Sequence, residues 1–281
     1  MRLAFAFGLA LATAGCVRDD LGDASFVEGL RVLGVQAEPP EALVGQSVTL
    51  TAWTVDTSGN SVDVAWSACL LPSDGLANPG CTDGSGNGLV PLGSGASITM
   101  TVPDVDPTIL GAPDATYGVY LPILAHATAG HDASDTIYRL RMHVIVPPEC
   151  TIDPPYRPGC VPNANPSYAG IQPLLDDSAG ATPTKKGTIW ALVAEYGGDS
   201  MENYFLPGAE TANGNSVPEQ LRTQWFATAG TFPDEPVGGD AVQKLTMDRA
   251  LPPAGGIIDL WVVAHDDRGG TGMTHRSFVM Q

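Results

Sequence analysis

Four cysteines carry the clearest chemistry in this chain. They are Cys69, Cys81, Cys150 and Cys160, and an even number of cysteines in an exported chain favours disulfides. Their separations favour the pairs Cys69–Cys81 and Cys150–Cys160, which would close loops of 12 and 10 residue steps. Loops this short stabilise a fold by a little under about 3 kcal/mol each on the entropic account of cross-linking. A zinc site is the alternative, but the spacing lacks the C-x₂-C pair typical of one.

Histidines offer a second kind of chemistry, because imidazole is a common metal ligand. Asp132 and Asp135 accompany His126 and His131, so a His/Asp metal site could form in this segment. A polar hairpin between two strands explains the same residues more simply. The motifs of P-loops, dinucleotide-binding folds, zinc proteases and serine hydrolases are all missing from the sequence. The sequence therefore predicts a protein without catalytic residues and without an organic cofactor.

Acidic residues dominate the charge of the chain. Asp and Glu number 31 against 13 Lys and Arg, which gives a formal net charge of −18 over 281 residues. Nucleic acid is excluded as a partner, because phosphate binding needs clustered Lys and Arg. The same scarcity of bases excludes a polybasic membrane patch.

The N-terminus has the three parts of a secretory signal. Arg2 supplies a positive charge, residues 3–14 form an apolar run without charges, and the small residues Ala14 and Gly15 precede Cys16. The run is shorter than the ~20 apolar residues that span a membrane. We therefore expect the protein to be exported.

The small residues before Cys16 resemble the lipobox of bacterial lipoproteins, although Thr13 stands where that family usually has leucine. The resemblance implies cleavage after residue 15 and lipidation of Cys16. Several acyl chains on one cysteine anchor a protein stably, whereas a single chain binds only marginally. Val17 stands where that family often has an aspartate that retains the protein in the inner membrane. The resemblance therefore implies a lipid anchor in the outer membrane, facing the periplasm or the cell surface.

A proline-rich segment divides the rest of the chain in two. Residues 147–166 hold seven prolines, which remove backbone donors and fix φ. We expect two domains of 116 and 115 residues, the usual size of a β-sandwich. The predicted order is a signal peptide over 1–15, a lipidated tether over 16–30, a first domain over 31–146, a stiff linker over 147–166 and a second domain over 167–281.

Apolar residues alternate with their neighbours in both halves, as they do in strands with one buried face. The alternating positions include Val48, Leu50 and Ala52 in the first half and Ile189, Ala191 and Val193 in the second. Short alternating runs between Gly- and Pro-rich turns are typical of β-sandwiches. The predicted fold class is therefore all-β.

Two tryptophans fall at corresponding places in the two halves. Trp66 and Trp225 each lie on the strand after the first long one, and a core tryptophan there resembles the immunoglobulin-like fold. Residues 31–50 resemble the first strands of bacterial Ig-like modules, and residues 256–270 resemble the last hairpin of PKD- and cadherin-like modules. The resemblance implies two tandem immunoglobulin-like β-sandwiches. Such folds host many functions, so it names none.

Acidic residues collect in two loops that the Ig-like resemblance places at one end of the second domain. Asp199 and Glu202 lie in the first loop, and Asp266 and Asp267 lie in the second. Oxygen ligands that converge from two loops suit Ca²⁺, which takes 6–8 oxygens. An ordinary solvated turn explains the same acids without a metal.

The sequence leaves three classes of function open. The first is a non-catalytic envelope lipoprotein that binds or supports another envelope component, a protein or a polysaccharide. The second is a carbohydrate-binding accessory module, in which Trp53, Trp190 or Trp261 would stack on sugars because each lies next to alternating core positions. The third is an enzyme whose site follows no recognised motif.

Peptide mapping under non-reducing conditions tests the predicted disulfides. Because the short separations favour local pairing, the peptides that hold Cys69 and Cys81 should be linked, and so should those that hold Cys150 and Cys160. A crossed pair, such as Cys69 with Cys150, would contradict both the pairing and the domain boundary.

Overall fold

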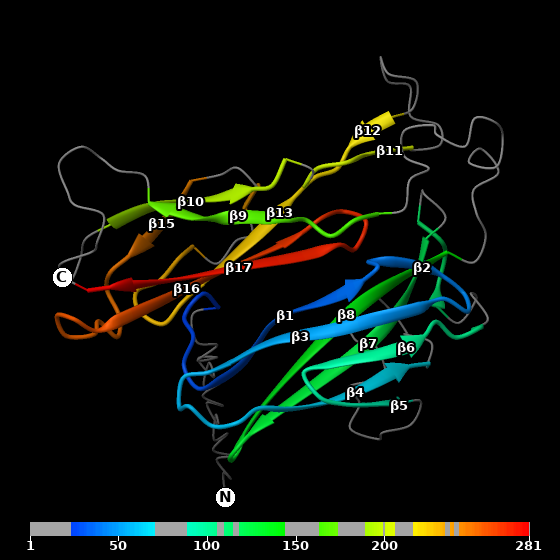
Figure 1. Ribbon diagram of the computed structural model, residues 1–281, viewed down its shortest axis with the longest axis horizontal. Coiled ribbons are helices and arrows are strands. Elements are labelled where there is room, and N and C mark those ends of the chain that lie inside the picture. Colours follow the sequence, from blue (N-terminus) through cyan, green and yellow to red (C-terminus); the bar gives the residue numbers. More distant parts are fainter. Residues whose placement is uncertain are drawn as a thin grey trace, which may run out of the picture.

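The computed structural model describes residues 24–70, 89–105, 110–114, 118–143, 163–173, 189–198, 200–205, 216–233, 237–238 and 242–280. These residues form two β-sandwiches, module 1 over residues 30–143 and module 2 over residues 168–280, and the predicted all-β, Ig-like fold is confirmed (Figure 1). In these ranges no helical segment has both the length and the apolar character needed to cross a bilayer.

Module 1 packs a three-stranded sheet against a five-stranded one. The three-stranded sheet has the order β1-β3-β6, with β1 (Leu30–Glu38), β3 (Ser47–Asp56) and β6 (Ser97–Thr101). The second sheet has the order β2-β8-β7-β4-β5, with β2 (Glu41–Leu43), β8 (Asp132–His143), β7 (Gly118–Ala129), β4 (Asp63–Cys69) and β5 (Leu89–Ser94). Only β2 and β8 run parallel among the paired strands that are described in this module.

Module 2 repeats this arrangement with fewer strands. One sheet has the order β15-β10-β9, with β15 (Gln243–Thr246), β10 (Ile189–Tyr196) and β9 (Tyr168–Pro173). The other has the order β14-β13-β16-β17, with β14 (Val237–Gly238), β13 (Arg222–Ala227), β16 (Ile257–His265) and β17 (Thr271–Val279). A two-stranded ribbon lies between β10 and β13 in the chain, formed by β11 (Asn203–Phe205) and β12 (Ser216–Pro218).

The two modules share one topology. The order β1-β3-β6 in module 1 corresponds to β9-β10-β15 in module 2, and the order β8-β7-β4-β5 corresponds to β17-β16-β13-β14. Both match the ABE and GFCC′ sheets of an immunoglobulin-like sandwich. Trp66 on β4 and Trp225 on β13 occupy the same place in this order, and both side chains lie in the core of their own module. The Trp66 indole N–H donates to the Gly95 carbonyl oxygen at 2.8 Å.

A third apolar cluster lies between the modules, and we call it the shared layer. It consists of Val27, Leu33, Phe226, Trp261 and Val263, with Trp53, Val55 and Met273 packed against them. Apart from Val27 of the N-terminal segment, these side chains come from outer sheet faces, β1 and β3 on one side and β13, β16 and β17 on the other (Figure 1). The approach is close: a Cβ atom on Gly34 would lie 3.2 Å from a methyl carbon of Val263 and 3.4 Å from the Trp53 ring.

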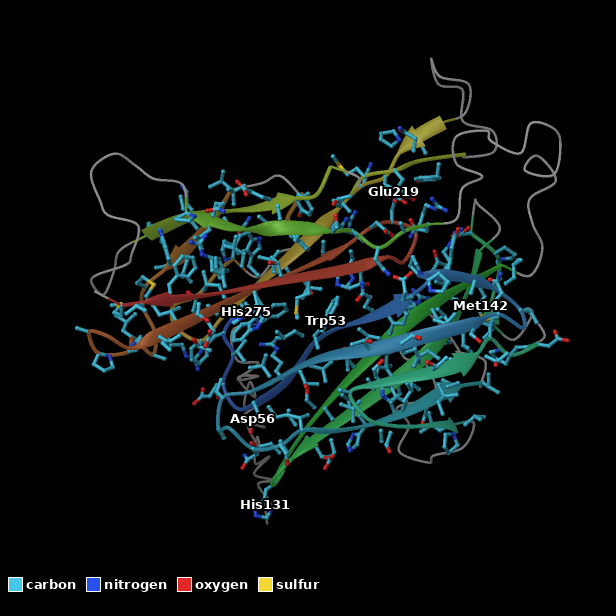
Figure 2. The ribbon with its side chains drawn as sticks, in the orientation of Figure 1. Trp53, Asp56, His131, Met142, Glu219 and His275 are labelled. Carbon is cyan, nitrogen blue, oxygen red and sulfur yellow. The ribbon has the colours of Figure 1, made fainter. Side chains whose placement is uncertain are left out.

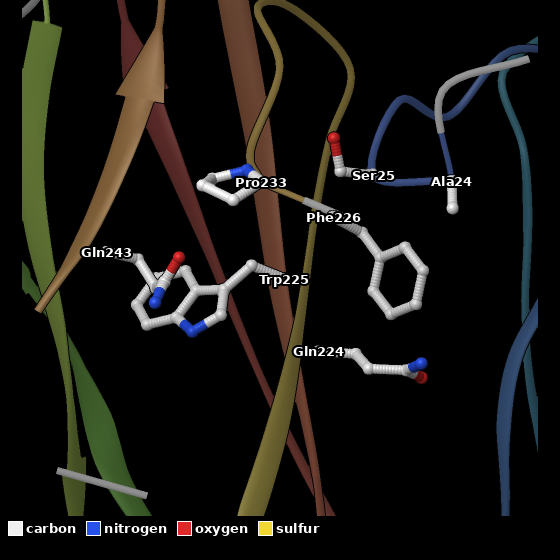
Figure 3. Close-up of a pocket in the computed structure, with 7 residues that line it drawn as sticks. All are labelled: Ala24, Ser25, Gln224, Trp225, Phe226, Pro233 and Gln243. Carbon is white, nitrogen blue, oxygen red and sulfur yellow. The ribbon is translucent and has the colours of Figure 1, made fainter. Parts of the chain in front are cut away.

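Strand β16 is therefore buried on both faces over part of its length, and so is the end of β13. Figure 3 shows Trp225 and Phe226 pointing to opposite sides of β13, and Trp225 belongs to the module 2 core while Phe226 belongs to the shared layer. On β16 every residue from Leu260 to Ala264 is buried. A continuous apolar run is what a strand with two covered faces requires.

The N-terminal segment departs from the predicted tether. Residues 24–29 were expected to belong to a tether over 16–30, but Ser25, Phe26 and Val27 are buried against module 2. The Val27 amide donates to the Ala227 carbonyl oxygen at 2.8 Å, and the Ser25 hydroxyl accepts the Phe232 amide at 2.8 Å. The segment is held because it completes hydrogen bonds at β13 and fills part of the shared layer.

Truncation of Trp261 tests the coupling between the modules. Trp261→Ala should cost about 3–5 kcal/mol of stability, because it removes a buried indole, and it should speed amide exchange in β1 and β3 of module 1. Trp190→Ala is the control, since Trp190 is equally buried but lies in the module 2 core. Hydrogen exchange followed by mass spectrometry measures both variants under conditions where module 2 stays folded. Faster exchange confined to module 2 in both variants would contradict the coupling.

A buried charged junction between the modules as candidate functional site

Charged side chains from both modules meet beside the shared layer, and we call this cluster the junction. Its centre is Arg268, which lies in the tight turn between β16 and β17 and is 5% exposed. The Asp266 carboxylate forms this turn by accepting the backbone amides of Arg268 and Gly270, each at 2.8 Å. Gly269 adopts φ 97°, a left-handed conformation that glycine takes without strain. The turn therefore directs the guanidinium toward module 1.

The Glu41 carboxylate on β2 joins the two modules. One oxygen accepts Arg268 Nη2 at 2.8 Å and the backbone N–H of Asn163 at 2.9 Å. The other oxygen pairs with Nη1 of Arg141 on β8. Glu41 and Arg141 are 7% and 1% exposed. Because burial removes both charges from water, such a pair is retained only when its remaining hydrogen-bonding groups are satisfied, as they are here.

A second carboxylate holds Arg141 from the module 1 side. The two Asp114 oxygens accept Arg141 Nε and Nη2, both at 3.2 Å, together with the Gly118 amide and the Tyr120 hydroxyl. Burial opposes the ionisation of Asp114, but Arg141 outweighs it and holds the pKa of that carboxyl well below its usual range. Burial, together with the charge of Asp114, raises the pKa of Tyr120 to about 12.

Module 2 contributes two further acids around Arg268. Its Nη1 lies 3.4 Å from Glu219 Oε1 and 3.8 Å from Glu202 Oε2. The second oxygen of Glu219 accepts the Glu202 backbone amide at 3.1 Å. Figure 2 shows Glu219 on the module 2 side of the junction, above Met142 of module 1. Carboxylates thus surround Arg268 from both modules.

Crowded carboxylates change the ionisation of this side of the junction. Burial, and secondarily the charge of Asp266, raises the pKa of Glu219 to about 7. Burial also raises the pKa of Asp266. The Asn163 side chain donates to Asp266 at 3.1 Å, while its own Oδ1 has no hydrogen-bond partner among the described residues. The junction therefore holds acids in excess of the guanidinium groups that face them.

The predicted calcium residues are partly brought together. Glu202 and Asp266 both lie at the junction, and the Asp267 carboxylate accepts the Tyr204 hydroxyl at 3.0 Å, whereas Asp199 lies outside the described residues. The positively charged Arg268 lies among these carboxylates and balances part of their negative charge. Within the described ranges, no group of three or more His, Cys, Asp or Glu side chains is arranged to hold a metal ion. Calcium binding here stays a prediction.

The other predicted sites are not at the junction. Cys69 ends β4, is buried and is disulfide-bonded, while Cys16, Cys81, Cys150 and Cys160 lie outside the described residues. The pairing and the lipidation therefore stay predictions. His126 Nδ1 lies 2.5 Å from an Asp135 oxygen on the paired strands β7 and β8, as a polar hairpin provides.

The three tryptophans proposed to stack on sugars face protein instead. Trp190 is 9% exposed and packs edge to face against Phe278, with ring centroids 4.5 Å apart. Trp261 lies in the shared layer, and Trp53 packs against it. The outward direction expected for Trp53 and Trp261 is correct for their own modules, but the other module covers that face. For Trp190 the expected face is wrong, because β10 buries Trp190, Leu192 and Ala194 rather than the residues between them.

A small hollow lies between the N-terminal segment and strand β13. It has a volume of about 20 Å³, enough for about one water molecule, and Ser25, Trp225, Pro233 and Gln243 contribute to its wall (Figure 3). The Trp225 indole N–H has no hydrogen-bond partner among the described residues. A single bridging water would suit this place, which is too small for a substrate.

Comparisons with known proteins identify no family. No protein-family model matches the chain, and no curated protein matches it. Among solved structures, dimeric latent PorU from Porphyromonas gingivalis aligns at 12% identity and a TM-score of 0.26, over 90% of this chain and 24% of that one. A DUF4785 family protein from Legionella pneumophila aligns at 9% identity and a TM-score of 0.23, over 88% of this chain and 56% of that one.

The α2-macroglobulin of E. coli gives a similar alignment, with 11% identity and a TM-score of 0.25 over 89% of this chain and 17% of that one. This chain thus spans between about a sixth and about half of the proteins it aligns with. Alignments with such low identities and TM-scores assign neither a family nor a function.

Neutralising Glu219 tests the ionisation of the junction. A carboxyl whose pKa is higher in the folded than in the unfolded state binds more protons when folded, so Glu219 should contribute a loss of stability as the pH rises from about 5 to about 8. Glu219→Gln should remove much of this slope and stabilise the protein at pH 8 by about 1–2 kcal/mol. Urea unfolding at both pH values measures it, with the exposed Glu195→Gln as control. An unchanged slope in Glu219→Gln would contradict the raised pKa.

Proposed function

We propose that the protein is a non-catalytic cell-envelope lipoprotein, anchored at the outer membrane through Cys16. Its two Ig-like modules form one rigid body that binds or supports another envelope component. The anchor is proposed from the sequence before Cys16, and the observation that supports the rigid body is the junction, where buried charged groups of both modules hold one another in place. A rigid pair of modules suits a protein that presents a surface at a defined orientation.

The chemistry of the junction supports a structural role for its charged groups. Glu41, Arg141, Asp114 and Arg268 each bind another group of the chain through several hydrogen bonds. Removal of one partner from such a buried pair costs about 3–5 kcal/mol, because an uncompensated charge remains. These buried charged groups of the junction are therefore engaged in holding the two modules together.

Sugar binding through exposed tryptophans is the weaker candidate, because Trp190 and Trp261 are buried and Trp53 packs against the shared layer. A protein partner in the envelope fits better, since sheet edges and end loops of Ig-like modules present backbone groups that another chain can pair with.

Cys16→Ser tests the anchor. Wild-type protein should enter the detergent phase and carry an acylated N-terminus at Cys16, because cleavage after residue 15 exposes that cysteine. Cys16→Ser should stay in the aqueous phase or remain uncleaved, whereas Thr13→Leu restores the residue usual in lipoproteins and should be processed fully. Unmodified wild-type protein in the aqueous phase would refute the lipoprotein proposal.

Spin labels on both modules test the rigid body. Nitroxides at the exposed positions Val90 and Ile189 should give a narrow distance distribution in otherwise wild-type protein. Arg268→Ala should broaden it, because Glu41 and Glu219 lose the guanidinium between them. Arg276→Ala is the matched control, since Arg276 donates to Ile171 and Gln172 within module 2. A broad distribution in the unmodified background would show that the modules move independently.

A further inference from the structure

We propose that a groove at the open end of the shared layer binds a segment of a partner protein that presents Arg or Lys beside apolar side chains. The inference rests on the proposed function, since it names the kind of partner that the displayed modules would hold. The groove has a volume of about 510 Å³. That is within the ~300–1,000 Å³ typical of ligand sites.

Three parts of the chain form the groove. The N-terminal segment contributes Phe26 and Glu28, the end of β3 contributes Val55 and Asp56, and module 2 contributes residues of β16 and of the loop before it. Figure 2 shows Asp56 and His275 on facing modules at this end of the molecule. The groove is therefore a feature of the paired modules and would not exist on either one alone.

Its apolar wall continues the shared layer. Trp261 and Val55 belong to the layer and also line the groove. Ile257 lies two residues before Asp259, on the same face of β16. It lines the groove and is 59% exposed. Its cross-strand partner Val279 is 57% exposed. The apolar surface of the shared layer thus continues into exposed apolar side chains, which an apolar side chain of a partner would cover.

Every titratable side chain among the lining residues is acidic: Glu28, Asp56 and Asp259. Asp56 accepts the amides of Ser58 and Asn60 at 3.0 and 2.8 Å, and these bonds fix its carboxylate at the rim. Asp259 accepts His275 Nε2 at 2.9 Å. The same Asp259 oxygen, Oδ1, also accepts the Ser277 hydroxyl at 2.5 Å, so its Oδ2 is the oxygen that faces an incoming donor. A basic side chain would therefore be attracted to the groove, and an acidic one would be repelled.

The wall already contains one example of this recognition. The Arg249 guanidinium lies 4.2 Å from the centre of the Phe26 ring, and its Nη2 is 3.6 Å from a Glu28 oxygen. A guanidinium over an aromatic face beside a carboxylate is the arrangement that favours arginine. The remaining acids, Asp56 and Asp259, offer carboxylates to an incoming arginine beside the apolar side chains of Val55 and Ile257.

Calorimetric titration of the full chain with acetyl-Ala-Leu-Arg-Leu-Ala-amide tests the proposal. We expect saturable 1:1 binding that weakens as salt is added, because ion pairs at a partly exposed site are screened. The same peptide with citrulline in place of arginine should bind about three- to ten-fold more weakly. Equal binding of the two peptides, or no binding of the arginine peptide, would overturn the proposal.

Matched variants locate the binding. Asp259→Asn and Ile257→Ser should each weaken binding about three-fold or more, while Glu195→Gln and Ile189→Ser on the outer face of β10 should leave it unchanged. Ile257 forms no side-chain hydrogen bond, so its variant tests the groove even if Asp259→Asn disturbs β17. Loss of binding in the control variants alone would place the site elsewhere and overturn the proposal.

A free guanidinium compound separates a protein segment from a small ligand. Agmatine should bind at least ten-fold more weakly than the arginine peptide, because it lacks the flanking leucines that cover Ile257. Equally tight binding of agmatine would mean that the groove takes small amines, and the protein-segment proposal would be wrong. None of these results alters the anchor or the distance measurements, so the inference can fail while the proposed function stands.

Discussion

The burial of apolar side chains on both faces of two facing sheets is the constraint on which the structure depends. Strand β16 contributes Leu260 and Val262 to the module 2 core and Trp261 and Val263 to the shared layer. Strand β3 contributes Leu50 and Ala52 to the module 1 core, while Trp53 and Val55 face module 2. Sheets that are apolar on both sides must be covered on both sides. The modules therefore need each other, and the pair forms one folded unit.

Apolar burial alone would not fix how the modules face each other, because it is not directional. The junction adds direction. Glu41 binds Arg141 within module 1 and Arg268 across the boundary, and hydrogen bonds between charged groups require defined geometry. The shared layer thus supplies cohesion, and the junction sets the orientation.

The sequence predicts the fold better than it predicts the junction. Alternation and the positions of Trp66 and Trp225 are local signals, and they suffice for two Ig-like sandwiches because each strand's period is set by its own residues. Alternation along a strand shows which residues share a face, but it does not show which of the two faces is buried. The buried face of β10 was therefore predicted one residue out of step. The run from Leu260 to Ala264 did carry the signal of a strand covered on both sides. Glu41 and Arg268 are 227 positions apart, and no local pattern links them.

The N-terminal segment takes part both in the packing between the modules and in the groove. Phe26 and Val27 lie at the boundary between the modules, and the same segment forms one wall of the acidic groove. In the proposed lipoprotein, Cys16 would precede by eight positions Ala24, the first described residue, which lies close to this boundary. An anchor so close to the boundary would hold the pair of modules as one body at the membrane. The groove would consequently lie near the membrane, where a partner already held in the envelope meets it at high effective concentration.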